Sequence, residues 1–218
     1  MFIFLIITCF GFCEQLVNSI WKRFRVEYYT SPDSYSAFIG SYSYYFGIGS
    51  LIIILLTFWM IWKFGWLKSA LIPPLVTLGT ALLLIIYMVT PSLKIATANF
   101  FNTSGIALIV GLFSLQMIIL KGLGILFLAT KEMAYIPLAI TTKARGKAIV
   151  DFLFGGGLGS ILIVVFMTFD FIPLGHGAEM AVLPTLIILC ATAFVWIAAV
   201  VYLGKMYKKA LEQDVVKS

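Results

Sequence analysis

Long apolar runs recur along this sequence and restrict its fold more than any other feature. The chain is 62% hydrophobic and only 11% charged, whereas soluble domains carry about 25% charged residues. So little charge cannot cover a water-facing globule, and the apolar side chains must face lipid or one another. A helix crosses a bilayer with about 20 mostly apolar residues. The runs predict an all-α integral membrane protein with about six transmembrane helices, at 2–21, 38–62, 69–89, 104–120, 148–169 and 180–203.

The six predicted spans form a single transmembrane unit over residues 1–218. The stretch 121–138 is not an ordinary loop, because Lys121-Gly122-Leu123-Gly124 interrupts a long apolar run. It predicts a broken helix or a helix that lies in the membrane interface. A charged tail at 205–218 closes the chain.

Basic residues are distributed unevenly between the two sides of the predicted membrane. Of the 15 lysines and arginines, 11 fall on the side that holds both chain ends and 4 on the other side. Short cytoplasmic loops carry such an excess, so both termini are predicted to be cytoplasmic. The net charge of +6 follows from this topology, and we do not expect nucleic acid as a partner.

Motifs for catalysis or metal binding are absent from the sequence. It has no H-E-x-x-H, G-x-S-x-G or Walker lysine loop. The cysteines Cys9, Cys13 and Cys190 sit in apolar runs, which is typical of small buried hydrophobic residues. The single histidine, His176, is far from them in sequence. We therefore expect no enzyme activity, no cofactor and no metal site.

Charged residues inside predicted spans are candidates for function, because a charge at the bilayer centre costs several kcal/mol. Glu14 lies deep in the first span, Lys121 at the end of the fourth and Asp151 near the start of the fifth. For Lys121 and Asp151 an alternative is open, since both could sit at an interface or extend toward it.

The densest charged cluster contains Lys131, Glu132, Lys143, Arg145 and Lys147. Lysine and arginine suit phosphate by charge, and arginine can bind it with two parallel hydrogen bonds. The cluster is therefore a candidate site for nucleotide phosphates. The alternative is that these charges only mark the cytoplasmic side.

The same region carries a recognisable motif. The run at 130–138, TKEMAYIPL, resembles a signature of the ATP/ADP translocase family of obligate intracellular bacteria, plastids and some intracellular eukaryotic parasites. At similar spacing it is followed by KARGKA at 143–148 and by Asp151, similar to the family's K-x-K-G-K-A and aspartate.

Further similarities lie upstream and in the family's order. QLVNSIWK at 15–22 is similar to N-L-V-E-x-x-W-K, YSAFIG at 35–40 to Y-x-x-F-M-G, and ALIPP at 70–74 to A-L-I-T-P. They correspond to the second half of a transporter of about twelve helices. We therefore expect a C-terminal half, or a fragment, of a larger carrier.

The resemblance implies exchange of ATP and ADP by alternating access, in a fold like the major facilitator superfamily with its site between two halves. The implied partners are ATP, ADP, the lipid bilayer, and a second six-helix half or a second copy of the chain. The implied location is the membrane of an intracellular bacterium, or of a related parasite or organelle. The implied phosphate-binding residues are Lys131, Glu132, Lys143, Arg145 and Lys147. A second set would line the pathway: Glu14, Asn18, Lys22 and Asp151.

The sequence departs from the family pattern at two places. Asn18 stands where the family has a glutamate, and Glu14 lies one helical turn earlier on a similar face. The glycine-rich run at 155–160 lacks the lysine of the family's L-G-K-S-G-G. The alternative function is therefore a degenerate paralogue, or a membrane interaction or structural protein, that does not exchange ATP.

Overall fold

The structure, a computed structural model, describes residues 2–135 and 178–217. Regular structure in these ranges is entirely α-helical, so the all-α part of the predicted fold class is confirmed for them. The predicted span 148–169 lies outside the described residues. The helices are α1 (Phe2–Tyr28), α2 (Pro32–Val89), α3 (Pro91–Phe101), α4 (Gly105–Ala134) and α7 (Ala178–Lys217).

In the described part of the chain, 4 helices are long and apolar enough to cross a membrane. They are α1, α2, α4 and the section Val182–Met206 of α7. The 58 residues of α2 would make a straight rod of about 87 Å, nearly three times the hydrocarbon thickness of about 30 Å. A single straight crossing is therefore excluded for α2.

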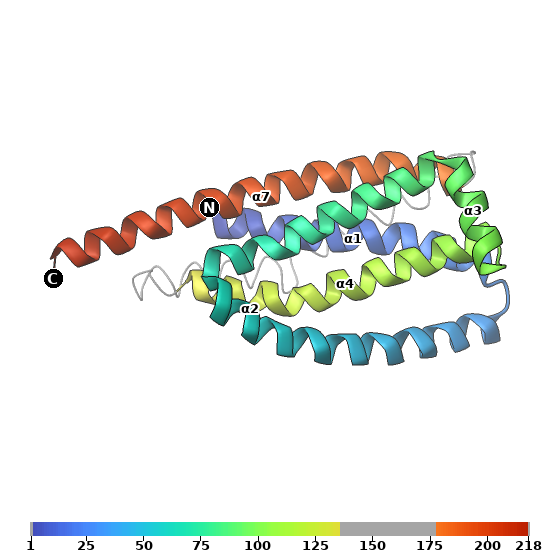
Figure 1. The fold of residues 1–218 in the computed structure, drawn as a ribbon, viewed down its shortest axis with the longest axis horizontal. Helices are drawn as coiled ribbons and strands as arrows, with labels where there is room; N and C mark the ends of the chain where they lie inside the picture. Colours follow the sequence, from blue (N-terminus) through green and yellow to red (C-terminus); the bar gives the residue numbers. More distant parts are fainter. Residues whose placement is uncertain (1, 136–177, 218) are drawn as a thin grey trace.

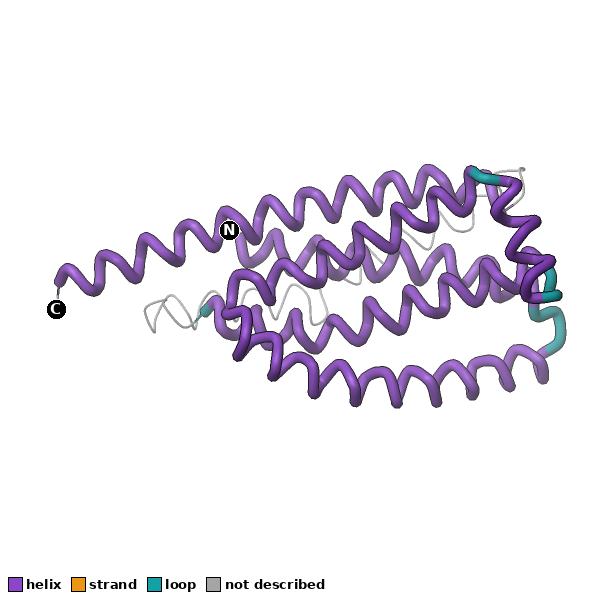
Figure 2. Tube along the Cα trace, viewed as in Figure 1, coloured by secondary structure: helices purple, strands orange, loops and turns teal. Residues whose placement is uncertain are grey.

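The chain reverses direction inside α2, at Gly65. This glycine has φ 73° and ψ 177°, which is not helical. The Ser69 hydroxyl donates to the Met60 carbonyl at 3.1 Å, although nine residues of straight helix would separate them by about 13 Å. Figure 2 shows the turn. It divides α2 into a first arm, 32–64, and a second arm, 66–89, which contain the predicted spans 38–62 and 69–89.

Contacts with α4 show that the first arm runs parallel to it. Gly49 lies against Ile118, and four residues further along both helices Gly122 lies against Ile53. Glycines at these positions let the two helices approach closely, as small residues do in membrane bundles.

The second arm runs antiparallel to α4. The Trp66 indole N–H donates to the Thr130 carbonyl at 2.8 Å. Further along the arm, Thr80 accepts a hydrogen bond of 3.3 Å from the Gln116 side-chain amide. Residue numbers rise on the arm while they fall on α4, which confirms the reversal independently of the backbone angles at the turn.

The first and last described helices, α1 and α7, also pack antiparallel. The rings of Phe2 and Tyr202 are 4.4 Å apart, and those of Phe10 and Trp196 are 5.7 Å apart. As a result, α1 begins and α7 ends toward the same end of the bundle (Figure 1).

Of the two structures predicted for 121–138, the broken helix is contradicted over the part that the structure describes. Helix α4 is continuous from Gly105 to Ala134. Its glycines Gly122 and Gly124 serve close packing against Ile53 and the Phe10 ring, rather than a break. Residues 136–138 lie outside the described part.

The stretch 90–103, read as a loop from the sequence, contains the 11-residue helix α3. Pro91 occupies its first turn, where proline is tolerated, and Asn102 ends it with a left-handed φ of 48°. None of its residues is buried, which is why apolar periodicity did not reveal it.

We expect Gly65→Ala to lower the apparent melting temperature of the purified chain in detergent. A φ of 73° strains any residue with a Cβ, by about 1–3 kcal/mol. Gly79→Ala is the matched control: a Cβ there also meets no atom within 4 Å, and alanine favours helix. Equal melting temperatures for the two variants would contradict a backbone role for Gly65.

Candidate substrate-binding site

A polar stripe runs along one face of α1. Glu14, Asn18 and Lys22 follow one another at intervals of four, so they lie on the same side of the helix. Glu14 and Asn18 are half-buried and Lys22 is exposed. Glu14 is close to the middle of the 27-residue α1, which places its carboxylate near the centre of the bundle rather than at an end.

Lys121 also lies at mid-depth, contrary to its predicted place at the end of a span. It is half-buried near the middle of the 30-residue α4. The prediction failed because α4 continues for 13 residues past it, to Ala134. Lys121 therefore lies inside a helix and not in a connection between two helices.

Two contacts fix the register between α1 and α4. The Phe10 ring lies against Gly124, and the Trp21 indole N–H donates to the Ser114 hydroxyl at 2.8 Å. The helices are therefore antiparallel, and these two contacts mark two levels of the bundle.

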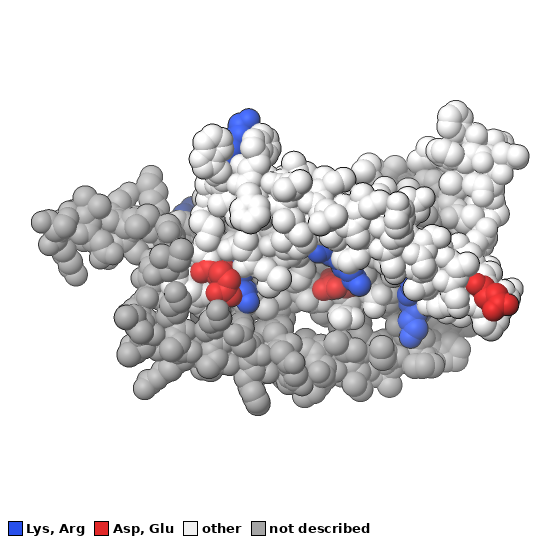
Figure 3. Space-filling view, turned by 90° about the horizontal axis from the view of Figure 1, so that it is seen from below, with Lys and Arg blue, Asp and Glu red and all other residues white. Residues whose placement is uncertain are grey.

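Glu14 and Lys121 lie between those two levels, at the same depth. On α1, Glu14 follows Phe10 by four residues and precedes Trp21 by seven. On α4, Lys121 follows Ser114 by seven residues and precedes Gly124 by three. These spacings put both residues on the facing sides of their helices. Among the described residues the two form no direct ion pair. Figure 3 shows acidic and basic atoms close together midway along one face, with further charged atoms toward both ends of that face.

Lys131 and Glu132 lie at the end of α4. Their side chains form an ion pair of 3.4 Å, with Lys131 13% and Glu132 47% exposed. A cation suits the last turn of a helix, because the carbonyl groups there are unpaired. Of the predicted phosphate cluster, only these two residues can be placed, since Lys143, Arg145 and Lys147 lie outside the described residues.

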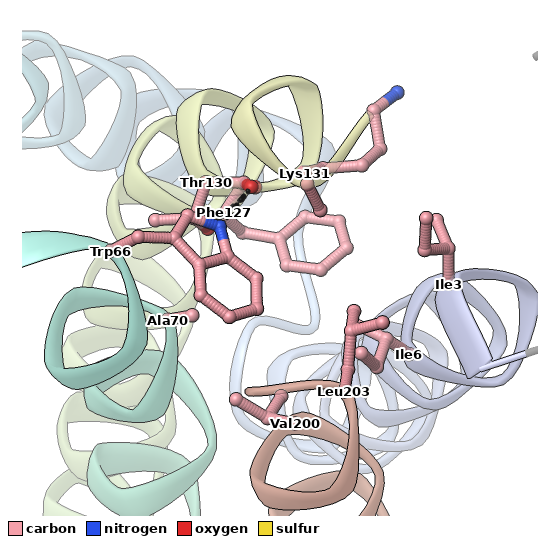
Figure 4. Close-up of a pocket in the computed structure, with 10 residues that line it drawn as sticks. Ile3, Ile6, Trp66, Ala70, Phe127, Thr130, Lys131, Val200 and Leu203 are labelled. Carbon is pink, nitrogen blue, oxygen red and sulfur yellow. Dashed lines mark hydrogen bonds between the residues drawn. The ribbon is translucent and has the colours of Figure 1, made fainter. Parts of the chain in front are cut away.

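A small pocket lies beside Lys131, where four helices meet (Figure 4). Its volume of about 20 Å³ is far below the 300–1,000 Å³ of typical small-molecule sites. The Lys131 ammonium points away from it, so the described residues alone do not enclose a nucleotide there. The lining residues are Ile3, Ile6, Trp66, Ala70, Phe127, Thr130, Lys131, Ala134, Val200 and Leu203.

The predicted site residues that the structure describes do not converge on one point. Lys22 lies near the Ser114 level of α4, and Lys131 follows Ser114 by 17 residues, about 25 Å along the axis. Glu14 and Asn18 lie between the two ends. Asp151 lies outside the described residues.

Sequence reasoning missed several polar side chains that have buried atoms. Arg25 on α1, Tyr42 on the first arm of α2 and Gln116 on α4 each carry a buried side-chain atom without a hydrogen-bond partner among the described residues. Arg25 could have been found, because it follows Glu14 by eleven residues and so continues the same face of α1. Tyr42 gives no such signal, because only the packing of α2 on α1 brings it there.

Acidic and sulfur-containing side chains do not gather into a metal site in the described part of the chain. No group of three or more His, Cys, Asp or Glu residues there could hold a metal ion.

Comparisons with known proteins agree on one family. The sequence model of the TLC ATP/ADP transporters matches residues 1–207. ADP,ATP carrier protein 4 of Rickettsia bellii is 30% identical over 210 residues, covering 95% of this chain and 40% of the relative. ADP,ATP carrier protein 1 of Chlamydia trachomatis is 31% identical over 227 residues, covering 98% and 41%.

The chain thus spans about two fifths of the length of the curated relatives it matches. No solved structure matches it. The family match nevertheless extends over nearly all of the sequence, from α1 into α7. This multi-pass membrane chain therefore belongs to the TLC ATP/ADP transporter family.

Proposed function

We propose that this chain forms part of a carrier that exchanges ATP for ADP across a membrane. The observation that carries the proposal is the family match over residues 1–207, since relatives from Rickettsia and Chlamydia are named ADP,ATP carriers. Relatives of this kind also favour the membrane of an intracellular bacterium as the location.

The described geometry supports a path for a charged solute. Glu14 and Lys121 are half-buried at the same mid-depth of the bundle. Charges at this depth are expensive unless they pair or face a water-filled cavity. We propose that both line the nucleotide path, together with Asn18 and Lys22 on the α1 stripe, and that Asp151 belongs to the same path.

Phosphate binding is assigned to the basic cluster around the end of α4. Lys131 is paired with Glu132 at 3.4 Å, and a phosphate could replace that carboxylate as the lysine's partner, because both present anionic oxygens. Lys143, Arg145 and Lys147 would add charge to the same site. In this arrangement Glu132 holds the lysine in place when no nucleotide is bound.

The proposed architecture is a six-helix unit that resembles one half of a major-facilitator-like carrier. A central site between two halves needs a partner, either a second six-helix half or a second copy of this chain. Rocking of the two halves would expose the site alternately to each side. The excess of basic residues in the sequence segments predicted to lie on the side of both chain ends supports a cytoplasmic location for both termini.

A second candidate function is a membrane protein of the same descent that does not exchange ATP. Asn18 favours it, because it removes a negative charge from the middle of the α1 stripe. The two functions differ in whether the chain carries nucleotide across the membrane.

We expect proteoliposomes that contain the full chain and are loaded with ADP to take up labelled ATP, and ADP-free ones to take up little. Exchange couples entry to exit, so uptake should depend on internal ADP. Binding of ATP without ADP-dependent uptake, by correctly inserted protein, would contradict exchange by this chain alone and favour the second function.

Removing Lys131 and Lys147 together should weaken ADP binding by about a hundredfold, since each charge-assisted bond to phosphate contributes about 1.4 kcal/mol or more, which is tenfold in affinity. Calorimetric titration of the K131Q/K147Q variant measures this. The control is K63Q/K68Q, which removes two exposed lysines beside the turn of α2. Equal losses in both variants would mean that the cluster acts only through net charge.

Glu14 and Lys121 should be energetically coupled. Removing one charge leaves the other uncompensated in a region of low dielectric constant. The stability losses of E14Q and K121Q should therefore add up to more than the loss in the double variant E14Q/K121Q. A double-mutant cycle on unfolding free energies in detergent should give a coupling of about 1 kcal/mol. The cycle of Glu14 with Lys63, an exposed lysine at the turn of α2, should be additive. Additivity in both cycles would overturn the coupling.

A further inference from the structure

Arg25 is a cation enclosed by aromatic rings at the end of α1 opposite the Lys131 end. Its side chain is 8% exposed. The guanidinium carbon lies 3.5 Å from the centre of the Trp21 ring and 5.7 Å from that of Tyr35. Its Nε has no hydrogen-bond partner among the described residues.

This burial is unusual for its position. Arginine stays protonated in proteins and carries five N–H donors, and near helix ends its long side chain normally extends into water. Lys22, one turn earlier on the same face, is exposed in this way. The ring contacts compensate the charge of Arg25, but ring faces offer no acceptor in the plane of the guanidinium donors.

A second polar atom without a partner lies in the same cluster. The Tyr42 hydroxyl is buried and makes no hydrogen bond within the described part of the chain. The Tyr42 ring lies 4.5 Å from that of Trp21, the ring on which Arg25 stacks. Two donors from different helices are thus left unsatisfied around one indole.

The indole itself is held rigidly. Its N–H donates to the Ser114 hydroxyl at 2.8 Å, and that hydroxyl donates to the Val110 carbonyl at 2.6 Å. Phe38 packs edge-on against it from α2, with ring centres 6.4 Å apart. The platform under Arg25 is therefore fixed by α4, and the guanidinium is the part of the cluster that can exchange partners.

We infer that Arg25 binds a phosphate group of the adenine nucleotide, with the Tyr42 hydroxyl as a second donor. Phosphate offers several anionic oxygens and accepts two parallel bonds from a guanidinium. The inference rests on the proposed function and extends it. The polar stripe on α1, formed by Glu14, Asn18 and Lys22, then ends in a phosphate position. This position lies about 25 Å from Lys131 along the helix axis. The path then has one cationic phosphate position near each end.

The test is ADP binding by the full chain in nanodiscs, measured by calorimetry with wild type, R25Q, R25K and Y42F. We expect R25Q to weaken ADP binding about tenfold or more and to leave adenosine binding within twofold, since adenosine has no phosphate. R25K keeps the charge and the ring contact but cannot form two parallel bonds, so it should remain several-fold weaker than wild type. Y42F should lose a smaller factor.

K63Q is the matched control. Lys63 also lies over a tryptophan ring, 4.7 Å from the centre of Trp59, but it is exposed and lies at the turn of α2. Its ADP affinity should stay within twofold of wild type. Melting temperatures check that each variant is folded. If R25Q does not fold, the ADP affinity of R25K carries the test.

Three outcomes would overturn the inference. ADP affinities of R25Q and R25K equal to wild type would remove Arg25 from the nucleotide site and leave the proposed function standing. A second outcome is that the Arg25 variants bind ADP as tightly as wild type but no longer retain phosphatidylglycerol that wild type retains in anionic nanodiscs. This would assign the position to a lipid phosphate instead. A wild-type chain that binds neither ADP nor ATP would overturn the proposed function and this site together.

Discussion

Helix α4 holds the described bundle together through side-chain hydrogen bonds to two neighbouring segments, α1 and the second arm of α2. Ser114 accepts from Trp21 of α1, and the Thr130 carbonyl accepts from Trp66 at the start of the second arm of α2. Gln116 donates to Thr80 further along that arm. Lipid tails are as apolar as leucine, so helices in a membrane associate through close packing and such bonds rather than through the hydrophobic effect. The glycines of α4 supply the close packing, against the first arm and against α1.

This arrangement sorts the charged residues by depth. Because α4 runs antiparallel to α1, the middle of one helix meets the middle of the other, and Glu14 and Lys121 come to the same level. Lys131 and Glu132 lie toward one end of the bundle, and Lys22 and Arg25 toward the other. A carrier that moves a multiply charged nucleotide needs compensating charge along its whole path, because each uncompensated charge in the hydrocarbon region costs several kcal/mol. The described helices provide cationic residues at three depths.

The reversal at Gly65 shows how much one residue can matter. Either side of it, the chain has helical geometry over an apolar sequence, and only the left-handed φ of the glycine turns one rod into two crossings. Hydropathy places the two crossings at 38–62 and 69–89, because Lys63 and Lys68 interrupt the apolar run. It does not reveal that the turn is so short. Hydropathy also ended the fourth helix too early, because Lys121 and the glycines after it resemble a loop in composition but are packed within a continuous helix.

The sequence by itself determined the membrane class, the presence of long apolar helices and the family, because these depend on apolar run length and on local motifs such as TKEMAYIPL at 130–138. Local patterns carry that information because a bilayer requires each crossing to satisfy its own backbone hydrogen bonds. Tertiary structure decided which charges share a depth and which side chains enclose Arg25. These relations join residues far apart in the chain, such as Trp21 and Ser114, 93 positions apart. No local pattern encodes them, since they follow from the direction and register in which whole helices pack.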